Sequence, residues 1–148
     1  MNTRTGVASI LLRVRRGSYE VLLLRRATQP FYGEWFAIEG GLQPGEQAHE
    51  AALREILEET CLVPERLYRE TPLPRVVPSA GYEVLLSVFV AFIAPDAEVT
   101  LNEEHSDYQW LQIAQAIDRV PLPAQKATLR RIESTFVLGV PPEQLRVL

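Results

Sequence analysis

The residues of this chain best suited to chemistry are three glutamates that follow a glycine-rich loop. The loop and the glutamates comprise Gly40, Gly41, Pro44, Gly45, Glu55, Glu58 and Glu59. From Glu46 onward, helix-forming residues continue without glycine or proline until Pro64, which predicts a helix to about Glu59. At about 100° per residue, the three carboxylates share an arc of roughly 100° on that helix. Their like charges repel, and a hard divalent cation bound by oxygen ligands offsets such repulsion.

The other side of the same helix is apolar. Leu53, Ile56 and Leu57 lie there, which predicts that they pack against a sheet. The alternative reading of the carboxylates is a solvated helix face, which explains most runs of glutamates. The glycine loop, Glu46 and Arg54 stand at fixed spacings from the carboxylates and favour metal binding over that alternative.

The segment from Gly40 to Leu62, GGLQPGEQAHEAALREILEETCL, resembles the Nudix box, G-x5-E-x7-R-E-U-x-E-E-x-G-U, where U is aliphatic. Every fixed position matches except Cys61, which stands where the family has its second glycine. The resemblance implies an α/β fold of the Nudix type, an α/β/α sandwich with a mixed β-sheet, in a single domain over residues 1–148. A cysteine at the helix end requires a costlier backbone or a different exit, and we expect its side chain to be a small buried hydrophobe instead of a reactive thiol.

Nudix enzymes cleave a nucleoside diphosphate linked to another group, using Mg²⁺ with Mn²⁺ as a substitute. The resemblance implies that Glu55, Glu58 and Glu59 are metal ligands. It also implies that Arg54 orients these carboxylates and that Glu46 secures the loop–helix junction, although an ordinary surface ion pair is the alternative for Arg54. Such an ion neutralises charge on a diphosphate and activates an attacking water.

A second acidic group precedes a strand-like segment. The run EHxxYxWL, Glu104 to Leu111, is similar to the Nudix branch that hydrolyses dihydroneopterin triphosphate and dATP, where the glutamate before the histidine binds metal. Glu104 is therefore the expected further ligand or general base, with Glu103 as second choice. A polar loop that caps a strand is the alternative. His105 either assists phosphate binding or is a structural loop histidine.

Residues that could contact substrate lie between the first strands and the helix. Arg25 and Arg26 follow a buried strand, and strand alternation allows only one of them to face the site. The same branch favours Arg25. By family comparison Glu39, Gly40 and Gly41 line the substrate. Loop aromatics could stack on a base or simply pack the loop onto the core. They are Phe31, Tyr32 and Trp35.

The remaining pattern mixes strands and helices in one unit. Strands are expected at residues 7–15, 19–24, 36–38, 83–93 and 107–111, and helices at 46–59, 113–120 and 124–136. Between them, Pro72, Pro74, Pro78 and Gly81 predict a long, partly rigid loop. The 148 residues suffice for one domain with a sizeable core.

Composition narrows the function. The net charge of −4 and the lack of a long basic run argue against nucleic-acid binding, RNA decapping included, but leave small polyphosphates as substrates. One cysteine and an N-terminus that is neither a secretion signal nor a membrane span favour the cytoplasm. We expect a pyrophosphohydrolase that converts a nucleoside triphosphate, or a related triphosphate, to monophosphate and pyrophosphate. The alternatives are hydrolysis of dinucleoside polyphosphates, ADP-ribose or sugar nucleotides, and a non-catalytic nucleotide sensor. A homodimer is left open.

Overall fold

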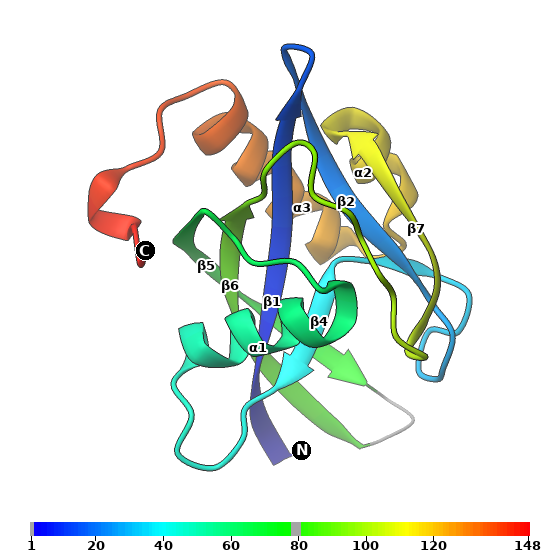
Figure 1. Cartoon of the computed structure of the whole chain (residues 1–148). Coiled ribbons are helices and arrows are strands. Elements are labelled where there is room, and N and C mark those ends of the chain that lie inside the picture. The colour runs from blue at the N-terminus through cyan, green and yellow to red at the C-terminus, as the bar shows by residue number, and fades with distance from the viewer. Residues whose placement is uncertain (1, 78–80) are drawn as a thin grey trace.

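The computed structural model describes residues 2–77 and 81–148, whose strands form one seven-stranded mixed sheet (Figure 1). The strands are β1 (Asn2–Arg15), β2 (Ser18–Arg26), β3 (Trp35–Phe36), β4 (Ile38–Gly41), β5 (Arg66–Val77), β6 (Tyr82–Phe92) and β7 (His105–Gln112). The helices are α1 (Ala48–Thr60), α2 (Ile113–Arg119) and α3 (Pro123–Ile132), and α3 runs into a π-helical turn, Glu133–Val137. A short 3₁₀ turn, Glu143–Leu145, precedes the C-terminus.

The sheet runs in the order β3-β2-β1-β6-β5, with β4 paired to β1 and β7 paired to β2. The pair β1–β6 is parallel and the other strand pairs are antiparallel, so the sheet is mixed. Helix α1 lies on one face, and α2 and α3 lie on the other (Figure 1). This arrangement confirms the predicted α/β fold with a mixed sheet between helices.

Alternation along the central strand β1 explains the two layers. Val7 and Leu11 belong to the apolar cluster under α1, together with Ile56. Ala8 and Ile10 belong to the opposite cluster. That cluster includes side chains of α2 and α3 among its buried residues: Ile113, Ala116, Ile117, Leu129 and Ile132. Each face of the sheet is therefore covered by its own hydrophobic layer.

The register between β1 and β4 decides where the glycine loop starts. Ala8 pairs with Glu39, and Val7 pairs with Gly40. Paired residues share a face of a sheet, so Glu39 lies on the α3 side while Gly40 lies beneath α1. Glu39 and Gly40 therefore face opposite sides of the sheet.

The predicted loop between Pro72 and Gly81 is wrong for most of its length, because β5 extends to Val77. Residues 78–80, which include Pro78, lie outside the described residues. The sheet admits the two remaining prolines for different reasons. Strand β5 is the edge strand, where a missing N–H need not break a ladder. The register also shifts between Glu70 and Leu73, which leaves Pro72 unpaired.

Two details of the helix prediction are also wrong. Leu57 is 51% exposed, because α1 buries a narrower stripe that contains Ala52 and Ile56. Cys61 does adopt the left-handed conformation expected of the glycine it replaces, with φ of 60° and ψ of 20°. Its side chain is exposed and not buried, although its neighbours Thr60 and Leu62 are both buried. None of the described helices has both the length and the apolar character needed to cross a membrane.

Candidate functional site

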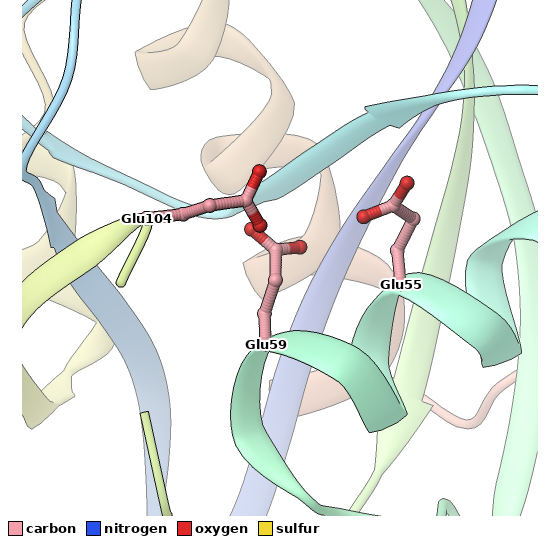
Figure 2. Close-up of side chains that lie close together, drawn as sticks. All are labelled: Glu55, Glu59 and Glu104. Carbon is pink, nitrogen blue, oxygen red and sulfur yellow. The ribbon is translucent and has the colours of Figure 1, made fainter. Parts of the chain in front are cut away.

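Three carboxylates converge where α1 meets the segment before β7. One oxygen each from Glu55, Glu59 and Glu104 lies within 4.8 Å of the others. Glu55 and Glu59 project from α1, and the Glu104 carboxylate approaches Glu59 from the other side (Figure 2). Two of these residues lie one helical turn apart, which explains why they share a face. The third comes from a distant part of the chain and is positioned only by the fold.

Glu59 is the most confined member of this group. Its side chain is 2% exposed, and its Oε2 has no hydrogen-bond partner among the described residues. Burial, and then the charges of Glu55 and Glu104, raise the pKa of Glu59 to about 9. Burial likewise raises the pKa of Glu55, against the opposing effect of Arg54. A buried carboxylate with an unpaired oxygen beside two like charges needs a positive partner.

The donor set fits a hard divalent cation. All three groups supply carboxylate oxygens, which Mg²⁺ and Mn²⁺ prefer, and no sulfur or imidazole belongs to the group. The unpartnered Oε2 of Glu59 points to the same conclusion, since a bound cation would satisfy it. Glu55, Glu59 and Glu104 could therefore hold the metal.

Glu58, although predicted as a ligand, does not belong to the convergent group. Its side chain is 50% exposed, and its Oε2 lies 3.3 Å from Nη1 of Arg54. Glu103 is exposed and also lies outside the group. The structure thus brings together two of the three box glutamates and the first choice from the second acidic run.

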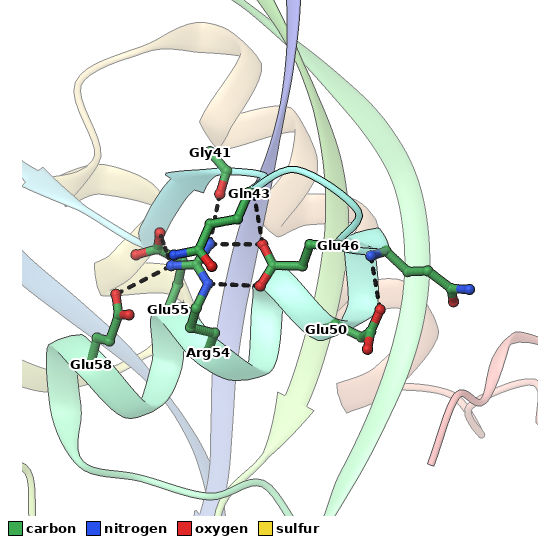
Figure 3. A network of polar contacts seen from close by, with 8 residues as sticks. Gly41, Gln43, Glu46, Glu50, Arg54, Glu55 and Glu58 are labelled. Carbon is green, nitrogen blue, oxygen red and sulfur yellow. Dashed lines mark hydrogen bonds and ion pairs between the residues drawn. The ribbon is translucent and has the colours of Figure 1, made fainter.

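Arg54 connects the loop to the helix through a branched set of contacts (Figure 3). Its Nε and Nη2 donate to the two carboxylate oxygens of Glu46, at 2.7 and 2.9 Å. Nη2 also donates to the carbonyl oxygen of Gly41, and Nη1 donates to Glu55 at 3.0 Å. Arg54 therefore holds Glu55 in place and ties the glycine loop to α1. These contacts are consistent with the predicted role of Arg54 in orienting the carboxylates and of Glu46 in securing the loop–helix junction.

Glu46 secures the other side of the loop. Its Oε1 accepts the backbone N–H of Gln43 at 2.9 Å, in addition to the contacts with Arg54. The Arg54 hydrogen bonds, and then that of Gln43, hold the pKa of Glu46 at about 2. Gly45 turns the chain between these residues with φ of 79°. Its left-handed conformation is one that glycine adopts without steric cost.

Gly40 is required for a different reason. A Cβ at this position would overlap the carboxylate of Glu55, whereas one at Gly41 would meet no atom within 4 Å. Strand β4 therefore approaches α1 so closely that a side chain at position 40 would collide with Glu55, a candidate metal ligand.

His105 supports the buried end of the carboxylate group. Its Nδ1 lies 3.5 Å from Oε1 of Glu59, beyond a good hydrogen bond. Burial, and then the charge of Arg26, lower the pKa of His105 to about 4. The ring is thus neutral at physiological pH. It is not among the residues that line the cavity beside the glycine loop. The loop before it is fixed by Asn102, whose Oδ1 accepts the N–H of Glu104, and by the N–H of Ala27, which donates to the carbonyl of Glu104.

A cavity of about 280 Å³ opens beside the glycine loop. Glu39, Gly40 and Gly41 line it, as the family comparison implied, and so do Phe31 and Arg26. The remaining lining residues are Arg4, Thr5, Pro30, Phe36, Arg75, Tyr82, Val84 and Leu86.

Arg26, and not Arg25, faces this cavity. Arg25 is exposed, and its Nε donates to the carbonyl of Gly33. Arg26 is half-buried, and its charge acts on Glu59, Glu39 and His105. It therefore lines the cavity and is near enough to the carboxylate group for its charge to act there. Strand alternation correctly predicted that one of the pair faces the site, but could not choose which.

Among the loop aromatics only Phe31 borders the cavity, with its ring centroid 5.1 Å from that of Phe36. Tyr32 is 65% exposed. Trp35 lies beneath the guanidinium of Arg119, 5.3 Å from its ring centroid. Of the three, Phe31 is thus the one placed where a base could stack on it, whereas Trp35 packs the loop against α2.

Among the lining residues that sequence reasoning missed is Arg75, which pairs with Glu39 across the sheet. It fell in the stretch interpreted as a loop. The signal that could have found it is the alternation of inward and outward side chains along a strand. Leu73 and Arg75 face inward and are each 5% exposed, whereas Val76 faces outward and is 49% exposed. The prolines obscured that period of two.

A family model of the NUDIX domain matches residues 3–132. The chain belongs to the Nudix family. This membership confirms the predicted family and its hydrolase class, and the fold agrees with it. The structure of a C. elegans Ap4A hydrolase binary complex is similar with a TM-score of 0.82 and 25% identity, covering 93% of this chain and 99% of that one.

Curated relatives carry several different names. An octanoyltransferase of Myxococcus xanthus is 32% identical over 134 residues, 84% of this chain, which spans only 35% of that protein's length. The nucleoside triphosphatase NudI of Klebsiella pneumoniae subsp. pneumoniae is 30% identical over 121 residues, which cover 76% of this chain and 84% of that protein. An asymmetrical bis(5'-nucleosyl)-tetraphosphatase of Caenorhabditis elegans is 26% identical over 132 residues, 88% of this chain and 94% of that protein.

Proposed function

We propose that this Nudix protein is a Mg²⁺-dependent pyrophosphohydrolase that cleaves a nucleoside triphosphate, ribo or deoxy, or a related triphosphate, to the monophosphate and pyrophosphate. The observation that carries the proposal is the convergence of Glu55, Glu59 and Glu104 next to a cavity bordered by Arg26. A cation site beside a cationic side chain and an open cavity suits a polyphosphate joined to a ring.

In this proposal Glu55, Glu59 and Glu104 hold the metal, which when bound neutralises phosphate charge and activates water. Arg54 keeps Glu55 in its ligating position through the contact at 3.0 Å. Glu58 contributes by pairing with Arg54, and its carboxylate would have to leave that arginine to bind the same ion. Positioning and electrostatics of this kind account for most of the rate in phosphoryl transfer.

Arg26 is the proposed phosphate-binding residue in place of Arg25. Its guanidinium borders the cavity and acts on Glu59, so a phosphate there would lie between metal and cavity. Gly40 and Gly41 allow a ligand to approach the backbone of β4. The cavity of about 280 Å³ suits one nucleoside and favours a mononucleotide over a dinucleoside substrate.

Product analysis tests the proposal. The protein would be incubated with Mg²⁺ and a panel of ribo- and deoxynucleoside triphosphates, dihydroneopterin triphosphate, diadenosine tetraphosphate and ADP-ribose, and the products separated by chromatography. Monophosphate with pyrophosphate from a triphosphate is the expected result, and chelation of the metal should abolish it. Release of orthophosphate from the triphosphates, or turnover in the presence of the chelator, would contradict the proposal.

A second candidate, hydrolysis of dinucleoside polyphosphates, is favoured by the likeness to the C. elegans Ap4A hydrolase. A Nudix domain in complex with ADP-ribose is also similar in fold, with a TM-score of 0.72. Turnover confined to diadenosine tetraphosphate or ADP-ribose in the same panel would establish that class instead. Binding of nucleotides without any turnover would indicate a sensor.

Other expectations remain proposals. They are a single domain over residues 1–148, a cytoplasmic location, and a small nucleotide as ligand with no role for nucleic acid. The acidic net charge of −4 supports the last of these.

A further inference from the structure

A buried ion pair lines one side of the cavity, away from the carboxylate group. Arg75 of β5 donates from Nε to Oε1 of Glu39 at 3.3 Å and from Nη2 to Oε2. The side chains are 5% and 15% exposed, and both line the cavity. Glu39 belongs to β4, on the far side of β1 and β6 from β5. The pair therefore reaches across β1 and β6 on one face of the sheet.

The ion pair of Arg75 and Glu39 has no net charge, whereas Arg26 is a cation. Arg75 and Glu39 neutralise each other, so together they suit a neutral polar ligand more than an anion. Arg26 donates to the carbonyl of Pro30 and forms no ion pair with any described residue. Its uncompensated charge suits phosphate. The cavity thus has an anion-binding part near Arg26 and a neutral hydrogen-bonding part at Glu39 and Arg75.

Arg75 retains unused donors. A guanidinium carries five N–H groups, and within the described part of the chain Arg75 makes only the two hydrogen bonds to Glu39. These remaining N–H groups can donate to a ligand that brings acceptors into the cavity. Each carboxylate oxygen of Glu39 also keeps capacity for a further donor. The pair therefore presents two acceptors beside a fork of donors.

Aromatic rings flank this hydrogen-bonding group. The Phe36 ring lies 5.2 Å from the guanidinium carbon of Arg75, and Phe31 packs against Phe36 at the cavity wall. A flat heterocycle that enters here meets an aromatic surface and a polar edge together, as base-recognition sites do.

We infer that Glu39 and Arg75 form the base-recognition element of the proposed triphosphate substrate, and that the favoured base is a 6-oxopurine, guanine above all. Guanine presents two N–H donors, at N2 and N1, followed along the same edge by two acceptors, O6 and N7. That order matches the carboxylate of Glu39 followed by the guanidinium of Arg75, and arginine with O6 and N7 is a common bidentate pairing. Adenine has an amino group where O6 would be, which opposes a donor to Arg75. The inference rests on the proposed function, since it assigns the base of that substrate.

The test begins with the wild-type protein. With Mg²⁺ present, kcat/KM is measured for GTP, ITP, ATP, CTP and UTP. We expect GTP to exceed ATP by about tenfold or more, because one bidentate pairing supplies discrimination of that order. ITP, which lacks the N2 amino group, should lie between them. A ratio of GTP to ATP near one would overturn the inference.

Variants then locate the selectivity. Arg75→Lys keeps a positive charge for Glu39 but removes the fork, so KM for GTP should rise about tenfold while the ATP values change little. Glu39→Gln combined with Arg75→Gln leaves no unpaired buried charge and should likewise bring the GTP to ATP ratio close to one. Arg69→Lys, an exposed position on the same strand, is the matched control and should keep the wild-type ratio. Equal losses for GTP and ATP in Arg75→Lys would show a purely structural pair and contradict the inference.

Binding without catalysis separates the two proposals. Calorimetric titration with GMP and AMP in the absence of metal should show tighter binding of GMP, and Arg75→Lys should remove the difference. If GMP is preferred but no triphosphate is cleaved, the base assignment stands and the proposed function fails. If triphosphates are cleaved and GMP and AMP bind equally, the proposed function stands and the base assignment fails.

Discussion

Glu46 is the carboxylate whose ionisation the fold favours most clearly. Its pKa is held at about 2 by hydrogen bonds from Arg54 and from the N–H of Gln43. Because the folded-state pKa lies below the ordinary value of 4.5, the contribution of ionised Glu46 to stability is present above about pH 4.5 and is lost as the pH falls towards 2. Glu46→Gln should therefore lower the melting temperature near neutral pH, with a difference from wild type that shrinks over that acidic range.

Thermal unfolding followed from neutral pH to pH 2 checks this expectation. Glu65→Gln is a suitable control, since the Glu65 side chain is exposed and makes no hydrogen bond to a described residue. Its effect should stay small at every pH. A Glu46→Gln difference that persisted unchanged at pH 2 would mean that the ionised carboxylate does not stabilise the loop.

Glu59 tests the metal assignment at a single side chain. Glu59→Gln keeps the shape of the residue and replaces a carboxyl whose pKa of about 9 makes it neutral without metal, so the fold should be retained. The loss of a ligand oxygen should lower Mg²⁺-dependent kcat by about 100-fold or more. Turnover assays, combined with thermal unfolding in chelator, would reveal both effects. Near-native turnover in this variant would refute the assignment of Glu59 as a ligand.

At the scale of elements, the contact between β4 and α1 is the one that positions the site. A Cβ at Gly40 would overlap the carboxylate of Glu55, whereas the space around Gly41 is open. Gly40→Ala should therefore displace α1 or the Glu55 side chain. A displacement of catalytic groups by about 1 Å lowers rates by about 100-fold, so we expect a loss of that size in kcat. Gly41→Ala adds the same methyl group to the cavity wall without meeting Glu55, so its loss of activity should be clearly smaller. Equal activities of the two variants in a steady-state assay would show that the close approach is not needed.

The end of α1 makes a prediction about stability. Cys61 has φ of 60°, a conformation that costs a side-chain-bearing residue about 1 kcal/mol. Cys61→Gly should relieve this strain and raise the melting temperature by about 3 °C. Cys61→Ala removes the thiol but keeps the Cβ, so it should bring no comparable gain. Calorimetry distinguishes the two, and a lower melting temperature for Cys61→Gly would mean that the exposed thiol side chain stabilises the fold.

For the whole molecule, the sequence predicted those features that depend on local spacing. The helix was expected from residue 46 to 59 and is observed as Ala48–Thr60, with Glu55 and Glu59 on one face. Helical periodicity alone could not separate Glu58 from Glu55 and Glu59, because the direction of its carboxylate depends on the contact with Arg54. The family resemblance supplied the mixed sheet between helices, which periodicity does not specify.

Features set by contacts between distant strands escaped prediction. Which of Arg25 and Arg26 faces inward depends on the register of β2, which is irregular at this position against β7. The pairing of Arg75 with Glu39 depends on β5, whose prolines signal a loop in sequence but are tolerated at an edge and a bulge. Arg75 meets Glu39 only because β5, β6, β1 and β4 lie side by side in the sheet, and local pattern carries no information about that order.

The proposed activity depends on α1 and the segment before β7 supplying ligands to one cation. The most direct measurement is the Kd for Mn²⁺, by electron paramagnetic resonance, in wild type, Glu103→Gln and Glu104→Gln. Neighbouring Glu103 lies outside the convergent group, so its variant should bind with wild-type affinity. Loss of the Glu104 carboxylate should weaken binding by about tenfold or more. Equal affinities in both variants would contradict a metal site shared between helix and loop.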